Sequence, residues 1–390
     1  MAGKKSGSLT DKVDKLGSIY QTIDSPEFIR SGSIVLDALL GGGIPRGCFI
    51  LWSSQTGIGK STGSLYVCKS YCVQGLKALY LDFEGGVNEN QLRGIGLDKH
   101  KYHKTKNPNG KFFIYRVTTF VDAEAFLDDL LGEVDLIVFD SVTAMLPAKL
   151  QDKSVEDIQP GVQSRLMSNL LQKYKAASID KGTSWIMINQ MRTKISFNSP
   201  SKDAEAGGNA LKFYADYRIL MKKAYPNGTL GKEEETVKGT VKIPYGAINE
   251  VWCEKSRYTR PFVPLSLAVI FGKGISNIYS YKEFLESKGV VSKNGSWYSI
   301  DIGDKGEQYK CQGEQGILEW IGKNKKIVVD FIDSCGGYSL IMNEKENVES
   351  IDKPSSNEEQ EYDYPVPTPN KEIPESGDEG QETEQVIIEE

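Results

Sequence analysis

The chain has 390 residues, of which 39% are hydrophobic and 26% charged, which is enough to bury a full core and typical of a soluble protein of two or three domains. Its longest apolar runs, such as 265–271, are too short to cross a bilayer, and its polar start lacks the apolar stretch of a signal peptide. Six cysteines without a CxxC pair favour free thiols in a reducing compartment, so we expect a cytoplasmic protein.

The net charge of −6 is distributed unevenly along the chain. Residues 343–390 contain 13 Glu, 3 Asp and 3 Lys, a net charge of −13, so the preceding 342 residues carry +7. A basic body with an acidic tail is typical of a protein that contacts a polyanion and regulates that contact. The alternative is that the tail only aids solubility.

The chain divides into four segments of different composition. Residues 1–30 are polar with apolar residues at helical spacing, which predicts a short N-terminal helical arm. Between 31 and 273, apolar runs alternate with helical patterns and predict a mostly parallel sheet covered by helices, with strands at 48–53, 78–83, 112–117, 134–140 and 184–189 and helices at 60–73, 123–131 and 162–178. Residues 274–342 look like a small separate domain, and the Glu- and Pro-rich segment 343–390 is expected to be disordered.

The segment 53–62, SSQTGIGKST, follows the first of these strands and precedes a helical pattern. Seven of the eight positions 54–61 fit the phosphate-loop pattern GxxxxGK[ST], with a serine in place of the first glycine. Glycines allow backbone N–H groups to converge on phosphate oxygens at the positive end of a helix. The alternative is an ordinary glycine-rich turn. The predicted nucleotide-binding residues are Ser54, Gln55, Thr56, Gly57, Ile58, Gly59, Lys60, Ser61 and Thr62.

Carboxylates follow two other strands of the predicted sheet. The buried run 134–140 ends in Asp140, which is placed to hold Mg²⁺ together with the Ser61 hydroxyl. The run 79–84 places Glu84 just past a strand end, where it can orient a water molecule for hydrolysis of the nucleotide. Asp82 is the local alternative, but by strand alternation it points to the other side. These residues predict an ATPase that uses ATP and Mg²⁺.

A further strand ends in the amide Gln190, and a loop of roughly 17 residues, 191–208, follows it. A structureless loop of this length inside a compact domain is usually functional. From this position the Gln190 amide is expected to sense the γ-phosphate, and the loop, which carries Arg192 and Lys194, to change its order with the nucleotide state.

At these residues the chain resembles the RecA family of DNA recombinases. The similar segments are GGNALKFY at 207–214, INQMRTKI at 188–195, SGSIVLDALLGGGIPRG at 31–47 and GSWYS at 295–299, and EKSR at 254–257 is similar to phage-encoded members. The resemblance covers about 30–341. It implies an α/β fold with a RecA-like P-loop ATPase core, an N-terminal polymerisation arm, a small C-terminal α/β domain and an acidic tail. It also implies filaments of many copies on single-stranded DNA, pairing with homologous double-stranded DNA and strand exchange.

The resemblance also implies roles for individual residues. Glu84 would activate water and Gln190 would sense the γ-phosphate, while Lys255 and Arg257 would reach across the filament interface to the neighbour's ATP. Phe213 would be an interface aromatic, and Phe271 and Gly272 would lie beside the adenosine across that interface. Two loops, about 151–164 and 191–208, would hold single-stranded DNA with Arg165, Arg192, Thr193, Lys194, Ile195, Gly207, Gly208 and Asn209.

The chain departs from the family at several positions. Gln91 replaces the aromatic that stacks on adenine, and Asn88 replaces the aspartate near its amino group, which predicts looser base selectivity. The lysine-rich segment 99–111 is either a solvated loop or a contact to duplex DNA. Two other functions remain open from the sequence: a hexameric helicase-type motor, and a non-catalytic DNA-binding recombination mediator.

Overall fold

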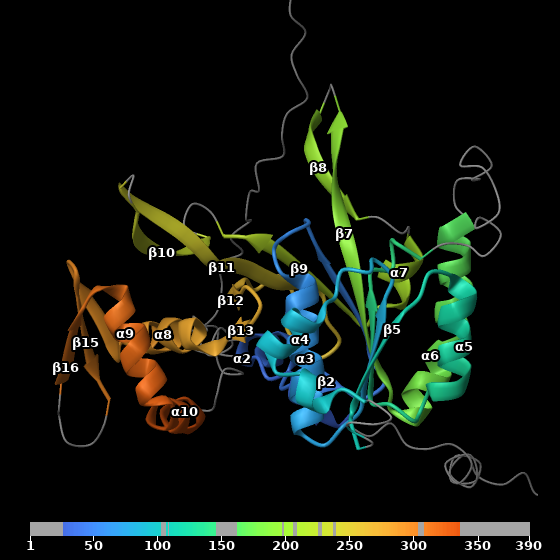
Figure 1. Cartoon of the computed structure of the whole chain (residues 1–390), viewed down its shortest axis with the longest axis horizontal. Helices are drawn as coiled ribbons and strands as arrows, with labels where there is room; N and C mark the ends of the chain where they lie inside the picture. The colour runs from blue at the N-terminus through green and yellow to red at the C-terminus, as the bar shows by residue number, and fades with distance from the viewer. Residues whose placement is uncertain are drawn as a thin grey trace, which may run out of the picture. The chain divides into compact units, whose positions relative to one another are not determined.

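The computed structural model describes residues 26–102, 107, 109–145, 162–196, 199–205, 209–224, 228–236, 239–302 and 308–335. In this part of the chain an 11-stranded sheet forms the centre, with the strand order β13-β12-β11-β9-β3-β7-β6-β4-β5 (Figure 1). The parallel strands are β9 (Tyr217–Lys223), β3 (Phe49–Ser54), β7 (Ser184–Ser196), β6 (Leu136–Asp140), β4 (Ala78–Asp82) and β5 (Phe112–Arg116). The predicted mostly parallel sheet is therefore confirmed.

Antiparallel strands complete the sheet beyond β9. They are β11 (Gly239–Lys255), β12 (Leu265–Ile270) and β13 (Gly274–Ser276), and β10 (Thr229–Thr236) pairs with β11 outside the main path. The short strands β1 (Phe28–Ile29) and β2 (Ile44–Pro45) form a separate pair.

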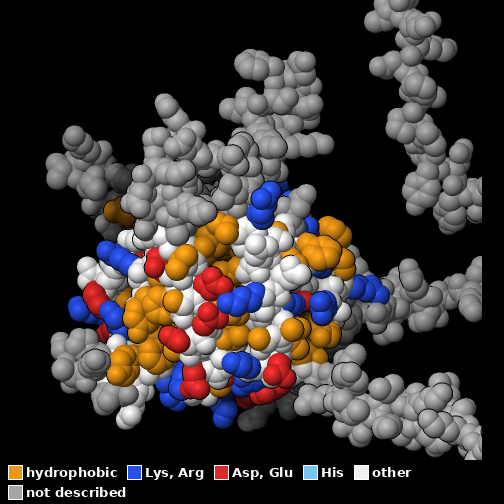
Figure 2. All heavy atoms as spheres, turned by 90° about the vertical axis from the view of Figure 1, so that its right-hand side faces the viewer, with side chains coloured by type: hydrophobic (Ala, Val, Ile, Leu, Met, Phe, Trp, Pro, Cys, Tyr) orange, Lys and Arg blue, Asp and Glu red, His pale blue; other side chains and the backbone are white. Residues whose placement is uncertain are grey.

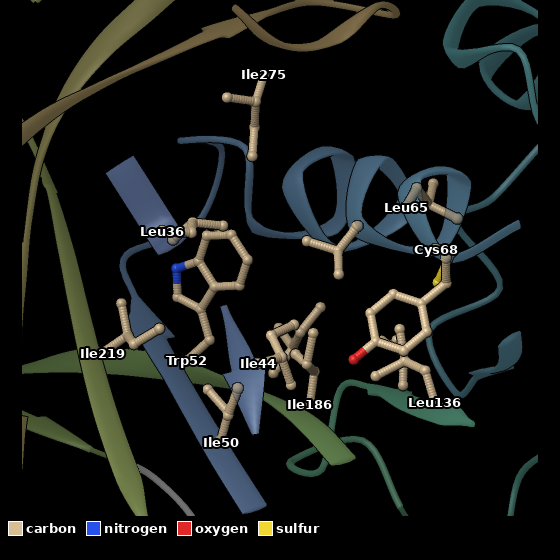
Figure 3. Close-up of a cluster of buried hydrophobic side chains, with 14 of the residues drawn as sticks. Leu36, Ile44, Ile50, Trp52, Leu65, Cys68, Leu136, Ile186, Ile219 and Ile275 are labelled. Atoms are coloured by element: carbon tan, nitrogen blue, oxygen red, sulfur yellow. The ribbon is translucent and has the colours of Figure 1, made fainter. Parts of the chain in front are cut away.

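Helices cover both faces of the sheet because its strands alternate between two apolar clusters. One cluster, which includes Trp52 and Ile186, packs against α2 (Ile34–Leu40), α3 (Lys60–Val73) and α4 (Glu89–Ile95), as Figure 3 shows for its centre. The other, which includes Phe49 and Trp185, packs against α5 (Phe120–Leu130), α6 (Val162–Lys181) and α7 (Asn209–Tyr214). The 3₁₀ turn η1 (Asp98–His100) follows α4. The expected helix 60–73 has the predicted bounds, whereas α5 begins three residues before the expected start because Thr119 and Asp122 form a capping box.

The predicted structureless loop after Gln190 is wrong in part. Strand β7 continues to Ser196, and β8 (Ser199–Glu205) pairs with it in antiparallel register, so this segment is a β-hairpin that extends from the sheet (Figure 1). In the β7 half, Met191, Thr193 and Ile195 alternate with Arg192, Lys194 and Ser196, a period of two that is typical of a strand, whereas the β8 half is polar.

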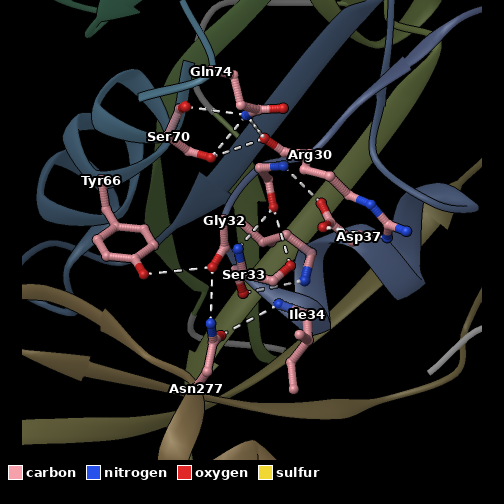
Figure 4. Close-up of polar contacts among 11 residues, drawn as sticks. Arg30, Gly32, Ser33, Ile34, Asp37, Tyr66, Ser70, Gln74 and Asn277 are labelled. Carbon is pink, nitrogen blue, oxygen red and sulfur yellow. Dashed lines mark hydrogen bonds and ion pairs between the residues drawn. The ribbon is translucent and has the colours of Figure 1, made fainter. Parts of the chain in front are cut away.

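The C-terminal elements have a hydrophobic cluster of their own. They are α8 (Asn277–Ser287), β14 (Val291–Asn294), β15 (Trp297–Asp301), β16 (Gln308–Gln312), α9 (Gly313–Lys323) and α10 (Lys325–Ser334). The segment 30–34 links them to the core: the Gly32 carbonyl accepts hydrogen bonds from the Asn277 amide and the Tyr66 hydroxyl, and Ser70 and Gln74 of α3 donate to the Arg30 carbonyl (Figure 4). The predicted domain boundaries stay predictions. Residues 1–25 of the predicted N-terminal arm and the whole acidic tail lie outside the described residues.

Asp216 anchors the amino end of the central strands. This buried carboxylate accepts the Phe49 N–H at 2.7 Å, forms an ion pair with Lys175, and lies 2.9 Å from the Arg257 Nε. Replacing Asp216 with alanine would leave the half-buried Lys175 ammonium unpaired, so we expect the free energy of unfolding to fall by about 3–5 kcal/mol. Urea denaturation measures this loss. Asp129→Ala, at an exposed position of α5, is the matched control, and equal losses for both variants would contradict the expectation.

Candidate nucleotide-binding site

The phosphate loop connects β3 to α3 at the carboxyl edge of the sheet, where parallel α/β folds bind ligands. Gly57 and Gly59 have φ angles of 78° and 101°, in the left-handed region that favours glycine. A Cβ on Gly59 would lie 2.8 Å from Val269, and the Asn249 amide donates to the Ile58 carbonyl at 3.1 Å. The loop is therefore held by its own backbone geometry and by side chains from β11 and β12.

Lys60 points into this loop. The residue is 7% exposed, and its ammonium donates to the Ser54 hydroxyl and the Gln55 carbonyl, each at 2.7 Å. Burial lowers the pKa of Lys60 to about 8, and the neighbouring Asp140 and Glu84 oppose that shift. The serine that replaces the first glycine of the pattern therefore supplies a hydroxyl partner for the loop lysine.

A pocket of about 260 Å³ opens beside the loop. It brings together most of the residues predicted for nucleotide chemistry, and its lining consists of Thr56, Gly57, Gly59, Lys60, Ser61, Thr62, Glu84, Asp140, Ile188, Gln190 and Phe271. Gln55 and Ile58 belong to the same loop but do not line the pocket. Residues from distant parts of the chain, from Thr56 to Phe271, thus meet at one edge of the sheet.

Glu84 is held by two hydrogen bonds at the pocket wall. The Gln190 amide donates to its Oε1 at 2.6 Å and the Ser141 hydroxyl at 2.5 Å. Asp82 instead accepts the backbone N–H groups of Gly85 and Val87 and does not line the pocket, so the preference for Glu84 over Asp82 agrees with the geometry. Ser141 was missed in the sequence, although it directly follows the strand that ends in Asp140.

Ser61 and Asp140 form an oxygen-donor pair. The Asp140 carboxylate is buried, which raises its pKa, and it accepts hydrogen bonds from the hydroxyls of Tyr80 and Ser61. A hydroxyl and a carboxylate beside a phosphate cradle fit Mg²⁺, which prefers one or two protein oxygens plus substrate phosphates.

Lys255 and Arg257 lie at the other edge of the sheet. Lys255 donates to the carbonyls of Phe213 and Ala215 at the end of α7, and Arg257 pairs with Asp216, whose carboxylate binds the N–H of the first residue of β3. The phosphate loop begins at the last residue of this six-residue strand. At ~3.3 Å per residue, roughly 17–20 Å separates the two ends, so neither cation reaches the pocket of its own chain.

The residues predicted to lie near the base are all described. Phe271 is 48% exposed and lines the pocket of its own chain, and Gly272 packs against α4, while their role across an interface stays a prediction. Asn88 caps α4 by accepting the Gln91 N–H at 3.0 Å, and neither side chain lines the pocket.

The residues predicted to hold DNA are only partly described. Arg165 is exposed near the start of α6, Arg192, Thr193, Lys194 and Ile195 follow Gln190 along β7 with only their backbone described, and Asn209 begins α7. Gly207, Gly208 and residues 151–161 of the first predicted DNA-binding loop lie outside the described residues, whereas 162–164 belong to α6. The face on the side of α5 and α6 mixes acidic and basic side chains (Figure 2). An ion pair between Lys173 and Glu124 joins these two helices.

The fold and the pocket define a P-loop nucleotide-binding protein. Comparison with known families finds a match between residues 8–276 and the RecA N-terminal domain. The chain is 31% identical over 315 residues to Protein RecA of Rippkaea orientalis, covering 80% of this chain and 84% of the relative. It is 32% identical over 317 residues to Protein RecA of Borrelia duttonii, covering 80% and 81%. The chain therefore belongs to the RecA family of recombinases.

A solved structure of the RadB recombinase superposes with a TM-score of 0.44 at 19% sequence identity, over 63% of this chain and 98% of that one. That likeness is too weak to bear on function. None of the helices in the described ranges combines the length and apolar character needed to cross a bilayer.

Proposed function

We propose that this protein is a DNA-dependent ATPase that forms filaments on single-stranded DNA, pairs that strand with homologous duplex and promotes strand exchange. The observation that carries the proposal is the position of Gln190. Its amide contacts Glu84 in the nucleotide pocket, and its strand leaves the sheet immediately afterwards as the β7–β8 hairpin. One residue thus joins the site of hydrolysis to the segment that carries Arg192 and Lys194.

Within the pocket, each residue has a distinct part in hydrolysis. Lys60 and the loop N–H groups bind the β- and γ-phosphates, and Glu84 orients and deprotonates the attacking water. Ser61 and Asp140 hold Mg²⁺, which when bound offsets charge on the phosphate oxygens. Gln190 exchanges its hydrogen bond to Glu84 for one to the γ-phosphate, which moves the base of the hairpin.

A second copy of the chain completes the site. Lys255 and Arg257 are too far from their own pocket, so in the proposal they neutralise transition-state charge in the pocket of the adjoining copy. Phe213 is 76% exposed on α7, the helix whose terminal carbonyls bind Lys255, which supports its predicted interface role. An interface that contains the nucleotide explains how ATP would control assembly.

The hairpin supplies the predicted contact to single-stranded DNA. Replacing Arg192 and Lys194 together with alanine is expected to weaken that binding and to lower the slope of log K against log salt by about 0.7 for each phosphate that is no longer neutralised. Fluorescence anisotropy over a salt series measures the slope. Lys77→Ala, an exposed lysine at the opposite edge of the sheet, is the control. An unchanged slope in the double variant would move the DNA site elsewhere.

The proposal is tested by a strand-exchange assay with ATP, single-stranded DNA and homologous duplex. Formation of heteroduplex is expected, and its absence would favour the other functions. If adding single-stranded DNA does not raise the rate of ATP hydrolysis, the result would favour the mediator. Closed rings in electron micrographs would point to a helicase-type motor.

A further inference from the structure

Tyr80 lies in the middle of β4, directly below the nucleotide pocket. Its side chain is fully buried in the cluster that packs against α3, and it does not line the pocket. Tyr80 pairs with Val138, two residues before Asp140, so the side chains of Tyr80 and Asp140 extend from the same face of the sheet. The phenol hydroxyl donates to the Asp140 Oδ2 at 2.5 Å.

The same hydroxyl also contacts the first turn of α3. It lies 3.4 Å from the Ser64 Oγ, and Ser64 donates to the Ser61 carbonyl at 3.0 Å. The phenol therefore contacts one predicted magnesium ligand, the Asp140 carboxylate, directly, and is linked through Ser64 to the backbone of the other, Ser61. A buried carboxylate oxygen next to apolar side chains requires such a donor, because an unpartnered one is costly.

We propose that Tyr80 is a positioning residue for magnesium, an inference that rests on the proposed Mg²⁺–ATP site. Its hydroxyl engages Oδ2 and fixes the rotation of the Asp140 carboxylate, so that the other oxygen is presented to the metal or to a water bound to it. Mutation of a partner that orients a metal ligand in this way typically lowers metal affinity by about 10–100-fold.

Tyr80→Phe removes only the hydroxyl and keeps the ring that fills the core. Binding of a fluorescent, slowly hydrolysed ATP analogue to the full chain is measured while Mg²⁺ is titrated. The Mg²⁺ concentration for half-maximal binding is expected to rise about tenfold, and at saturating Mg²⁺ the nucleotide affinity returns to that of the wild type. A purely structural tyrosine would leave the Mg²⁺ midpoint unchanged.

Tyr71→Phe is the matched control. Tyr71 is also fully buried against the same cluster, but its hydroxyl lies near Arg46 and Asp135 at the amino edge of the sheet. Thermal unfolding without nucleotide reports any loss of stability separately. In an Asp140→Asn background, adding Tyr80→Phe is expected to cause no further shift, because the carboxylate that the phenol holds is absent.

Three results would overturn the inference: a Tyr80→Phe titration that overlays the wild type, an equal shift for Tyr71→Phe, or a full additional shift in the Asp140→Asn background. In each of these the wild type still binds nucleotide with Mg²⁺, so the proposed function is untouched. Absence of Mg²⁺-dependent nucleotide binding by the wild type would overturn both.

Discussion

Replacing Glu84 with glutamine is expected to slow ATP hydrolysis by about 10²–10⁴-fold, the usual contribution of a general base. The glutamine carbonyl can still accept the hydrogen bonds from Gln190 and Ser141 that hold this side chain. Its amide cannot take a proton from water. ATP binding and assembly on single-stranded DNA should therefore persist while hydrolysis slows. Single-turnover hydrolysis and equilibrium binding measure the two properties separately.

Glu89→Gln is the matched control for that experiment. Glu89 lies at the start of α4, pairs with Lys101 and does not line the pocket, so its replacement should leave hydrolysis unchanged. If the Glu84→Gln variant hydrolyses ATP at the wild-type rate, another group must activate the attacking water. Loss of ATP binding would instead give Glu84 a role in holding the nucleotide.

Two inactive variants should restore activity when they are mixed. Lys60→Ala removes the pocket lysine and keeps the distant cations, whereas a chain with Lys255→Ala and Arg257→Ala keeps the pocket. Each variant alone is expected to lose about 10³-fold or more of its turnover, by analogy with arginine fingers. In an equimolar mixture, roughly a quarter of randomly formed head-to-tail interfaces pair an intact pocket with intact cations. DNA-dependent ATPase of the mixture should approach that fraction of the wild-type rate.

The control is a chain that carries all three substitutions. It is mixed first with the Lys60→Ala chain and then with the chain that carries Lys255→Ala and Arg257→Ala. These mixtures contain no interface with both an intact pocket and intact cations and should stay inactive. A mixture of the first two variants that shows only the sum of their separate rates would place Lys255 and Arg257 outside the neighbour's site.

Local patterns in the sequence were sufficient to predict the parallel strands β3 to β7 and the phosphate loop, but not the strands β9 to β13. The glycines and Lys60 are contiguous, and a buried apolar run precedes Asp140, so neither depends on distant residues. Glu84 and Gln190 follow strand ends, and parallel strands bring their carboxyl ends to one edge. The hydrogen bond of 2.6 Å from the Gln190 amide to the Glu84 carboxylate is a consequence of that topology.

Features that depend on long-range pairing could not be read from the sequence. The β7–β8 hairpin was expected to be a structureless loop because its second strand, Ser199–Glu205, is polar and shows no apolar alternation. Lys255 and Arg257 were expected to act together across an interface, but only the fold places both at the amino edge beside α7 and Asp216. Tyr80 looked like an ordinary core residue of a strand, because its hydroxyl partner is 60 positions away.

The central claim is that ATP lies between adjoining copies and that this contact prepares the hairpin for single-stranded DNA. Sedimentation velocity of the purified protein with a single-stranded oligonucleotide and a slowly hydrolysed ATP analogue tests it most directly. We predict assemblies with many copies on each oligonucleotide, which disappear when the analogue is replaced by ADP. A protein that stays monomeric with the oligonucleotide and the analogue would contradict the claim.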